Sequence, residues 1–180
     1  MTARDLVIRQ ERPLDRDRID LVLRLAFAGE RVVRLVELIR ASSNWLAELS
    51  FVALVGGEVV GYVLLSRVEF EGESGEVLTL SPLAVHPDHA GRGIGSALMR
   101  RALADAEQRG AVVVLEGDPD FYRRFGFEPA SQHGIERPSA LIPDAGFQVH
   151  ANTRVPLPRG KVVYPPAFWV AGAVGPGEAV

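Results

Sequence analysis

Residues 80–110 constrain the fold of this chain more than any other stretch. An apolar run and a His-Pro turn lead into three closely spaced glycines, Gly91, Gly93 and Gly95. Beyond them, apolar residues recur every three or four positions as far as Gly110, as on one face of a helix that ends at a glycine cap. This order predicts a buried strand, a turn and a helix whose first amides are free to bind an anion, most simply a phosphate.

Two common phosphate-binding motifs do not match this glycine cluster. A dinucleotide-binding fingerprint that starts at Gly91 needs a glycine or alanine where Ser96 stands, and one that starts at Gly93 meets Leu98. A nucleotide-triphosphate loop needs a lysine directly after its last glycine, but the only lysine of the chain is Lys161. Both motifs are therefore excluded, and another phosphate-containing ligand is expected.

Residues 90–95 resemble the signature of the GNAT superfamily of acyl-CoA-dependent N-acetyltransferases, in which Arg/Gln-x-x-Gly-x-Gly/Ala follows an apolar strand. Gly93 and Gly95 match it, whereas Ala90 stands where the family usually has Gln or Arg. A second segment, residues 121–127, resembles the family's late helix and turn, a Tyr followed by x-x-x-Gly-Phe. Two motifs in the right order are more specific than either alone. The context of both is similar to the YhbS-type branch of predicted N-acetyltransferases.

The resemblance implies an α/β (α+β) fold of the GNAT type. We expect a mixed, strongly twisted sheet of about six to seven strands flanked by about four helices, with splayed central parallel strands. The acetyltransferase domain is expected over residues 1–150. Residues 151–180 are rich in proline and are expected to form an extension that packs on the domain and becomes a loose tail from about residue 171.

The same resemblance implies that the chain binds acetyl-CoA. The apolar strand residues would offer main-chain groups to the pantetheine arm, and Arg92 would assist the pyrophosphate, with Arg123 or Arg124 nearer the adenosine phosphate. The expected cofactor-binding residues are Leu83, Ala84, Val85, Gly91, Arg92, Gly93, Ile94, Gly95, Ser96, Asp118, Phe121, Tyr122 and Phe125.

Acetyl transfer to an amine also needs a proton donor and a proton acceptor. The family commonly uses a tyrosine as the general acid at the position of Tyr122, although a tyrosine among phenylalanines is often a packing residue with a hydrogen-bonded hydroxyl. For the general base the sequence leaves three possibilities open: Glu76, His86 or a water held by backbone carbonyls. A main-chain N–H freed near Leu83 or Ala84 would stabilise negative charge on the carbonyl oxygen.

Other segments predict the rest of the domain. Helical periodicity indicates two early helices before residue 41, and two strand-forming runs on either side of Gly56 and Gly57 indicate a hairpin. Pro82 interrupts the central strand and predicts a bulge there, because proline cannot donate to a sheet. The glutamates of residues 69–76 are read as an exposed acidic turn, which mildly favours a cationic acceptor if Glu76 faces the cleft.

Composition excludes several classes of partner. A net charge of −3 and a pI near 5.8 offer no general attraction for nucleic acid or anionic lipid. Without cysteine, the chain has no disulfides, zinc-thiolate sites or thiol nucleophiles. His86, Asp88 and His89 lack a further metal ligand at suitable spacing, so no metal is expected. The charged N-terminus does not resemble a signal peptide and no apolar run is long enough to span a membrane, which predicts a cytoplasmic protein.

These observations predict an N-acetyltransferase that moves an acetyl group from acetyl-CoA to a primary amine of a small molecule or peptide. The alternatives are a non-catalytic acyl-CoA-binding or regulatory module of the same fold, and an enzyme that uses a longer acyl chain. The acceptor itself has no recognisable sequence code. Phe168 and Trp169 are expected to be exposed near the C-terminus and to make a homodimer possible.

Overall fold

The computed structural model describes residues 6–73, 75–151 and 154–175. Its helices are α1 (Arg16–Phe27), α2 (Arg31–Arg40), α3 (Ile94–Arg109), α4 (Pro119–Tyr122) and α5 (Pro166–Val170). Its strands are β1 (Leu6–Gln10), β2 (Trp45–Val55), β3 (Glu58–Arg67), β4 (Glu69–Glu73), β5 (Val77–Val85), β6 (Val112–Glu116), β7 (Phe127–Pro129), β8 (Ile135–Glu136), β9 (Phe147–His150) and β10 (Arg159–Val163). Both early helices and the β2–β3 hairpin lie where the sequence predicts them. None of the described helices is long and apolar enough to cross a membrane.

Seven strands form the main sheet, in the order β1-β2-β3-β5-β6-β9-β7. The β5–β6 pair is parallel and the other five pairs are antiparallel. The strand–helix–strand unit β5-α3-β6 supplies the one parallel pair of this sheet, as expected for strands joined by a helical crossover. The predicted mixed sheet of six to seven strands is therefore confirmed.

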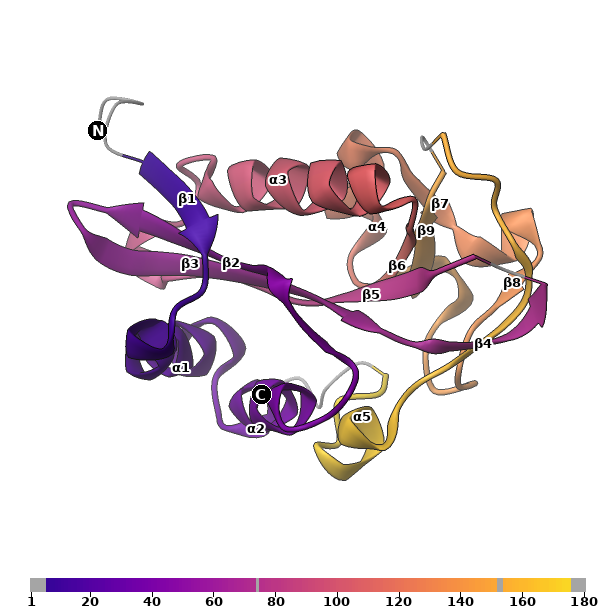
Figure 1. Ribbon diagram of the computed structural model, residues 1–180, viewed down its shortest axis with the longest axis horizontal. Helices are drawn as coiled ribbons and strands as arrows, with labels where there is room; N and C mark the ends of the chain where they lie inside the picture. The colour runs from indigo at the N-terminus through magenta and orange to yellow at the C-terminus, as the bar shows by residue number, and fades with distance from the viewer. Residues whose placement is uncertain (1–5, 74, 152–153, 176–180) are drawn as a thin grey trace.

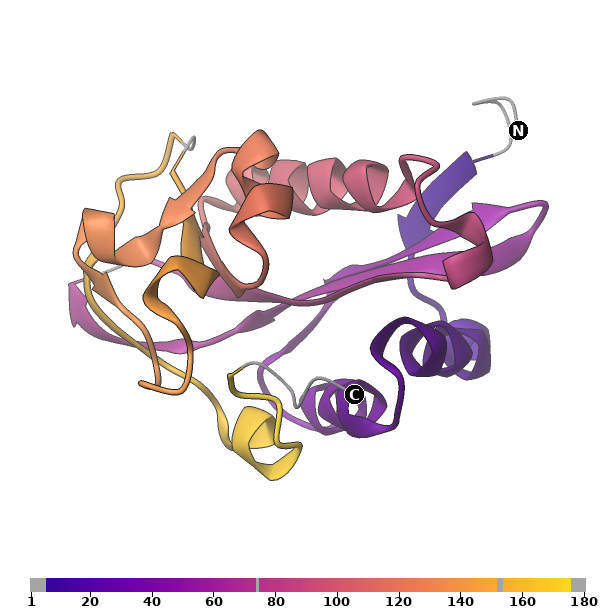
Figure 2. The same cartoon turned by 180° about the vertical axis from the view of Figure 1, so that it is seen from behind.

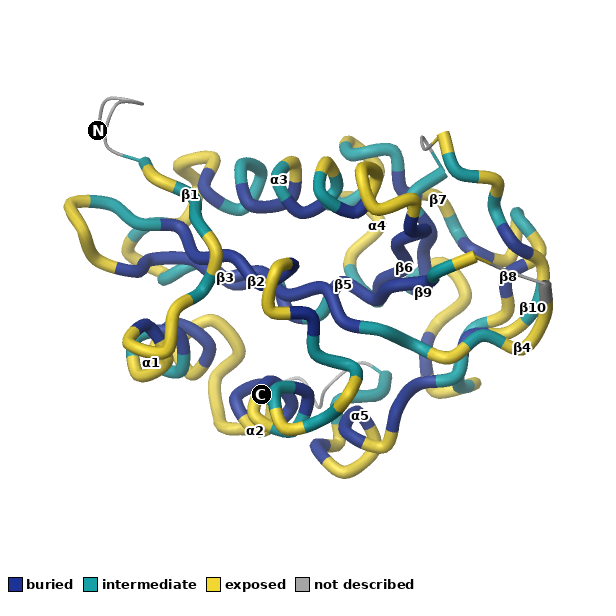
Figure 3. Tube along the Cα trace, in the orientation of Figure 1, coloured by how far each residue is buried: buried dark blue, intermediate teal, exposed yellow. Residues whose placement is uncertain are grey.

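Helices cover both faces of the main sheet. Figures 1 and 2 show α3 and α4 on one side and α1, α2 and α5 on the other. Each face buries its own apolar cluster, one against α3 and one against α1 and α2. The strands between these layers are the most buried part of the chain (Figure 3), so β5 and β6 have little freedom to move.

Helix α3 forms where the periodicity predicts it. Its residues at helical spacing, Ile94, Leu98, Ala102 and Ala106, are all buried against the sheet. Gly110 adopts a left-handed conformation (φ 74°) and ends the helix, because its N–H bonds back to carbonyls of the last turn. Because this buried face packs against the sheet, the start of α3 lies next to the end of β5.

The central strands separate partway along their length. β5 pairs with β6 only from Val77 to Thr79, and the pairing of β5 with β3 shifts register around the predicted bulge at Pro82. Beyond Thr79, the β6-facing side of β5 pairs with no described strand. The expected bulge and splayed parallel strands are both present, and they open the sheet next to the glycine cluster.

The sequence analysis expected the acidic segment, residues 69–76, to be an exposed turn. The structure differs from this expectation. Residues 69–73 form β4, which pairs with β10 in a second sheet of three strands, in the order β4-β10-β8. The sequence pattern failed here because glutamates have low strand propensity and the pairing partner lies about 90 residues away. Tertiary pairing overrides the local preference.

The C-terminal segment also differs from the expectation. Phe168 is 2% exposed and stacks on Tyr164 with ring centroids 4.4 Å apart, so only Trp169, 48% exposed, remains of the predicted exposed pair. Residues 171–175, expected to begin a loose tail, pack on the domain: Ala171 is buried and Ala173 contacts the core on the α1–α2 side. The rest of the predicted tail, residues 176–180, lies outside the described residues.

Candidate functional site

A cleft of about 990 Å³ opens where β5 and β6 separate. Its walls come from six places in the chain: the junction of α1 and α2, the second half of β5, the glycine cluster with the start of α3, the segment from Glu116 to Arg124, the turn with Pro143 and Gly146, and Ala173 with Gly175. Segments that are distant in the sequence therefore meet at the gap in the sheet.

The glycine cluster forms one end of this cleft. Gly91 and Gly93 have left-handed backbones (φ 71° and 80°), which glycine adopts without strain, and no described atom lies within 4 Å of the place a Cβ would occupy. Gly93 is the N-cap of α3 and has no side-chain cap, so the first amides of this 16-residue helix have no partner within the helix. Open space, free N–H donors and the positive end of a long helix together suit a phosphate.

Tyr122 contributes a phenol to the same cleft. Its ring packs edge-to-face on Phe121 and Phe127, with centroids 4.8 and 5.8 Å away. Burial, reinforced by the charge of Asp118, raises the pKa of Tyr122 to about 12. The hydroxyl is therefore protonated throughout the neutral range and is available there as a hydrogen-bond and proton donor.

Gly117 makes room for the Tyr122 ring. A Cβ at this glycine would overlap the ring, at its nearest with Cε2, although the backbone of Gly117 is not in the left-handed region. Asp118 then begins α4 as its N-cap by accepting the N–H of Asp120 at 2.9 Å, and Pro119 occupies the first helical turn. The sequence Gly-Asp-Pro thus sets the tyrosine in its place.

Glu116 is a candidate site residue that the sequence analysis missed. It ends β6, lines the cleft, and accepts the N–H of Gly175 on Oε2 at 3.3 Å. Burial raises the pKa of this carboxyl, while the Gly175 N–H and the positive charge of Arg31 oppose the shift. The one available signal was a lone acidic residue at the end of an otherwise apolar strand. A half-buried carboxylate with a raised pKa is a stronger base than an exposed one.

Glu116 and Tyr122 reach the cleft from opposite faces of the sheet. Along β6, Val112 and Val114 pack in the cluster under α1 and α2, whereas Val113 packs in the cluster under α3. Because side chains alternate along a strand, Glu116 points to the α1–α2 side. Tyr122 packs against the α3-side cluster. The gap between β5 and β6 lies between these two faces, so the carboxyl group of Glu116 and the hydroxyl of Tyr122 approach it from its two sides.

Most of the predicted cofactor-binding residues do line the cleft. They are Leu83, Val85, Gly91, Gly93, Ile94, Gly95, Ser96, Asp118, Phe121 and Tyr122. Ala84, Arg92 and Phe125 do not: Ala84 is buried under α1 and α2, Arg92 is exposed, and Phe125 packs behind Phe121 with centroids 5.6 Å apart. Arg124 lines the cleft, with its guanidinium 4.1 Å from the Phe121 ring centre.

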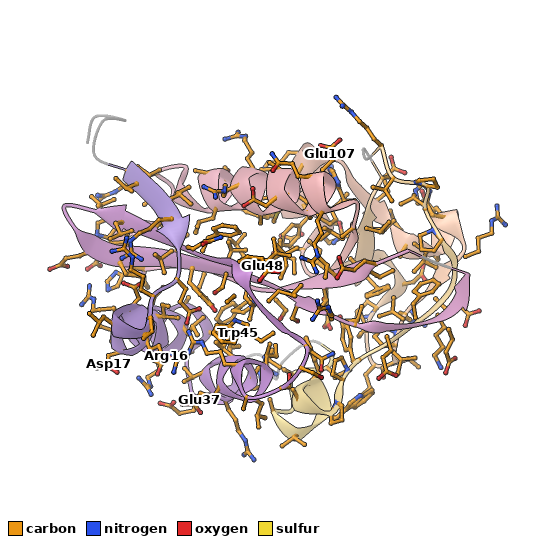
Figure 4. The ribbon with its side chains drawn as sticks, in the orientation of Figure 1. Arg16, Asp17, Glu37, Trp45, Glu48 and Glu107 are labelled. Carbon is orange, nitrogen blue, oxygen red and sulfur yellow. The ribbon has the colours of Figure 1, made fainter. Side chains whose placement is uncertain are left out.

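Glu76 is not brought to the cleft. Arg109 donates two hydrogen bonds to it, from Nε to Oε2 and from Nη2 to Oε1 (3.0 Å). Nε of Arg67 donates a third to Oε1 at 3.4 Å. These hydrogen bonds lower the pKa of Glu76, and Arg109 has the largest effect. Arg109 also binds Glu48 (2.9 Å), which Figure 4 shows on the α3 side of β2. Arg109 is the last residue of α3, about 24 Å along the helix from the glycine end. An ion-paired carboxylate at that end cannot serve as the base.

The histidines of the turn contact each other and the backbone of Asp88. Nδ1 of His86 accepts the N–H of Asp88 at 3.2 Å, and the His86 ring meets that of His89 edge-on. His89 lines the cleft, but His86 does not. Across the described ranges, no three His, Asp or Glu side chains are grouped as a metal ion would need.

Comparisons with known proteins agree with this geometry. The pattern of the Acetyltransferase (GNAT) family matches residues 20–127. YhbS of Escherichia coli (strain K12), described as an uncharacterized N-acetyltransferase, is 36% identical over 147 residues, which are 81% of this chain and 86% of YhbS.

Two solved structures of similar proteins share the fold. A 1.55 Å crystal structure of E. coli YhbS in complex with CoA has a TM-score of 0.83 and 33% identity, over 91% of this chain and 92% of that one. A GNAT family acetyltransferase from Brucella melitensis in complex with acetyl-CoA has a TM-score of 0.74 and 33% identity, over 91% and 97%. The glycine cluster at Gly91 and Gly93, which we call the glycine cradle, and the splayed strands agree with what these relatives show. The chain belongs to the GNAT family of N-acetyltransferases.

Proposed function

We propose that this protein transfers an acetyl group from acetyl-CoA to a primary amine of a small molecule or peptide. The observation that carries the proposal is one cleft with a phosphate cradle at its end and, on opposite sides of the sheet, a protonated tyrosine and a half-buried carboxylate. Two structures similar to this chain hold CoA and acetyl-CoA.

The residues of the cleft fit CoA. The cradle at Gly91 and Gly93 is open and rich in N–H donors, which suits the pyrophosphate. Leu83 and Val85 lie on the half of β5 whose β6-facing edge has no described strand partner, so its main-chain groups are available to the amides of the pantetheine arm. When bound, acetyl-CoA supplies an activated acetyl group as a thioester.

The two titratable groups divide the proton transfers between them. Glu116 accepts the proton of the incoming amine on the α1–α2 side, and its raised pKa suits that task near neutral pH. Tyr122 donates its hydroxyl proton to the departing sulfur on the α3 side. A main-chain N–H of the β5 bulge, near Leu83 or Ala84, holds the carbonyl oxygen. Glu116 replaces Glu76 in this scheme.

Calorimetric titration with acetyl-CoA and CoA tests the cofactor assignment. Gly93→Asp places a carboxylate at the cradle and is expected to weaken binding at least 100-fold, because like charges repel at close range. Gly110→Asp is the matched control: Gly110 has a similar backbone (φ 74°), no described atom within 4 Å of a Cβ, and lies at the other end of α3. Its affinity for CoA should equal that of the wild type.

Turnover decides between an enzyme and a non-catalytic module. Release of CoA from acetyl-CoA in the presence of a panel of primary amines is expected from the wild type, and parallel assays with propionyl-CoA and butyryl-CoA report the acyl-chain preference. Binding of acetyl-CoA without turnover on any amine would support the non-catalytic acyl-CoA-binding module. Absence of binding would overturn the proposal altogether.

A further inference from the structure

The half of the cleft on the α1–α2 side is built differently from the half that holds the glycine cradle. Phe27 at the end of α1 and Val32 and Leu35 on α2 form an apolar wall there. Arg31, the first residue of α2, lines the same half, and Glu116 enters it from the sheet. This half therefore presents one base, one cation and an apolar surface.

The guanidinium of Arg31 is available to a ligand. Within the described part of the chain, no carboxylate forms an ion pair with it, and the side chain is exposed. The neighbouring acid, Glu30, is instead bound by Nε of Arg24 at 2.5 Å. The charge of Arg31 reaches Glu116, since it opposes the rise in the pKa of that carboxyl. Arg31 thus lies near the base but is not neutralised by it through a direct contact.

We propose that the acceptor is an amino acid or a similar primary amine that carries a carboxylate and an apolar body, with Glu116 at its amine and Arg31 at its carboxylate. The proposal rests on the acetyl-transfer function above and names the substrate class. A guanidinium presents paired N–H donors that match a carboxylate, and the wall of Phe27, Val32 and Leu35 suits an apolar side chain. In the reaction the amine nitrogen forms a bond to the acetyl carbon, the carbon–sulfur bond breaks, Glu116 takes the amine proton, and Tyr122 supplies one to sulfur.

The structure gives no support to a cationic acceptor such as a polyamine. Residues 69–73 of the acidic segment form β4, which pairs with β10, and Glu69, Glu71 and Glu76 do not line the cleft. Asp118 does line the cleft, but it caps α4 on the opposite face, beside Tyr122. A second cationic group on the acceptor would meet Arg31.

The test compares amines that differ only in the carboxylate. L-leucine is paired with isopentylamine and L-phenylalanine with phenethylamine, and kcat/KM is expressed per neutral amine at fixed, saturating acetyl-CoA. We expect the amino acid to exceed its neutral partner by about 10-fold or more, and Arg31→Gln to reduce this ratio by about 10- to 100-fold, as for loss of a charged hydrogen bond. Arg34→Gln, also exposed on α2 but outside the cleft, is the control and should keep the ratio.

A binding measurement keeps the test independent of turnover. N-acetyl-L-phenylalanine keeps the carboxylate and lacks the amine, and N-phenethylacetamide lacks both. Calorimetry on the CoA-saturated protein should show tighter binding of the first compound, and the difference should disappear in Arg31→Gln while Arg31→Lys retains part of it. CoA affinity measured on Arg31→Gln shows whether the cofactor, rather than the acceptor, uses this side chain.

Two results would overturn the inference. Equal kcat/KM for carboxylated and neutral amines, with no effect of Arg31→Gln on the ratio, would reject the substrate class and leave the acetyltransferase function intact. A loss of CoA affinity in Arg31→Gln as large as the loss of preference would assign Arg31 to the cofactor instead. If no amine is acetylated, the function fails, and the comparison of N-acetyl-L-phenylalanine with N-phenethylacetamide still decides whether Arg31 binds a carboxylate.

Discussion

At the residue scale, a single atom, the hydroxyl oxygen of Tyr122, separates the proposed proton donor from a residue that only packs. Tyr122→Phe keeps the ring between Phe121 and Phe127 and removes only the hydroxyl. We expect kcat to fall about 100-fold, the usual range for loss of a general acid, while affinity for CoA changes less than twofold. Steady-state kinetics and calorimetry measure the two quantities. An unchanged kcat would show that the tyrosine only packs.

The position of that ring depends on Gly117. In Gly117→Ala the new methyl group would overlap Tyr122, so the ring must move, and a displacement of about 1 Å is enough to lower kcat about 100-fold. Gly75→Ala is the control, because Gly75 lies outside the cleft, its backbone is not left-handed, and no described atom lies within 4 Å of the place a Cβ would occupy. Normal kcat in Gly117→Ala would mean that the site tolerates a shifted tyrosine.

At the scale of elements, a buried polar cluster joins the segment after β1 to α2 and the sheet. The side chain of Glu11 is 3% exposed, and its Oε2 accepts hydrogen bonds from the hydroxyls of Ser50 and Tyr62, the second at 3.0 Å. Nη2 of Arg40, whose side chain is 8% exposed, lies 2.9 Å from Oε1 of Glu11. Arg40 also stands over the Tyr62 ring, 5.8 Å from its centre. This cluster ties α2, and with it the apolar wall of the cleft, to β2 and β3.

Removing the charge of Glu11 leaves the buried Arg40 with only the more distant carboxylate of Asp20, 3.9 Å away, as an ion-pair partner. Glu11→Gln is therefore expected to lower the free energy of unfolding by about 3 kcal/mol, measured by urea denaturation. Glu58→Gln breaks the exposed pair with Arg18 (side chains 74% and 42% exposed) and should change it by less than about 1 kcal/mol. Equal effects of the two changes would show that burial adds nothing to the Glu11–Arg40 pair.

At the scale of the whole molecule, the proposed proton acceptor and proton donor lie on opposite faces of the sheet, and the shifts of their pKa values predict the pH dependence. Burial raises the pKa of Glu116 above its ordinary 4.5, so the base form is lost as pH falls through that raised value. Tyr122, with a pKa of about 12, keeps its proton well above pH 10. With rates expressed per neutral amine, kcat/KM should rise with pH to a plateau and show no fall below pH 10.

Glu116→Gln tests that assignment. The variant should lose about 100-fold in kcat/KM at the plateau and also lose the acid limb, because glutamine does not titrate. Full retention of the acid limb in Glu116→Gln would assign it to another group. Glu76→Gln is the control, since Glu76 is bound by Arg109 and Arg67 outside the cleft, and its pH profile should match that of the wild type.

The parts of the site that lie within a short stretch of consecutive residues could be predicted from the sequence, and the parts that are brought together by the fold could not. The glycine cradle and the Tyr122 turn each occupy fewer than ten consecutive residues, so their motifs were readable from the sequence. The proposed general base was not, because Glu116 at the end of β6 and Glu76 just before β5 are both single glutamates with no surrounding motif. Only the fold shows that one is ion-paired at the far end of α3 and the other is at the gap.

The sequence by itself determined the two early helices, the β2–β3 hairpin, the strand, turn and helix of residues 80–110, the bulge at Pro82 and the end of the cleft that suits a phosphate, because periodicity, proline and glycine act over a few residues. Tertiary structure alone decided that β4 pairs with β10, that Phe168 is buried, and that Arg31 and Gly175 meet the same cleft as Glu116. Those outcomes depend on contacts between segments 60 to 140 residues apart, for which the chain has no local code.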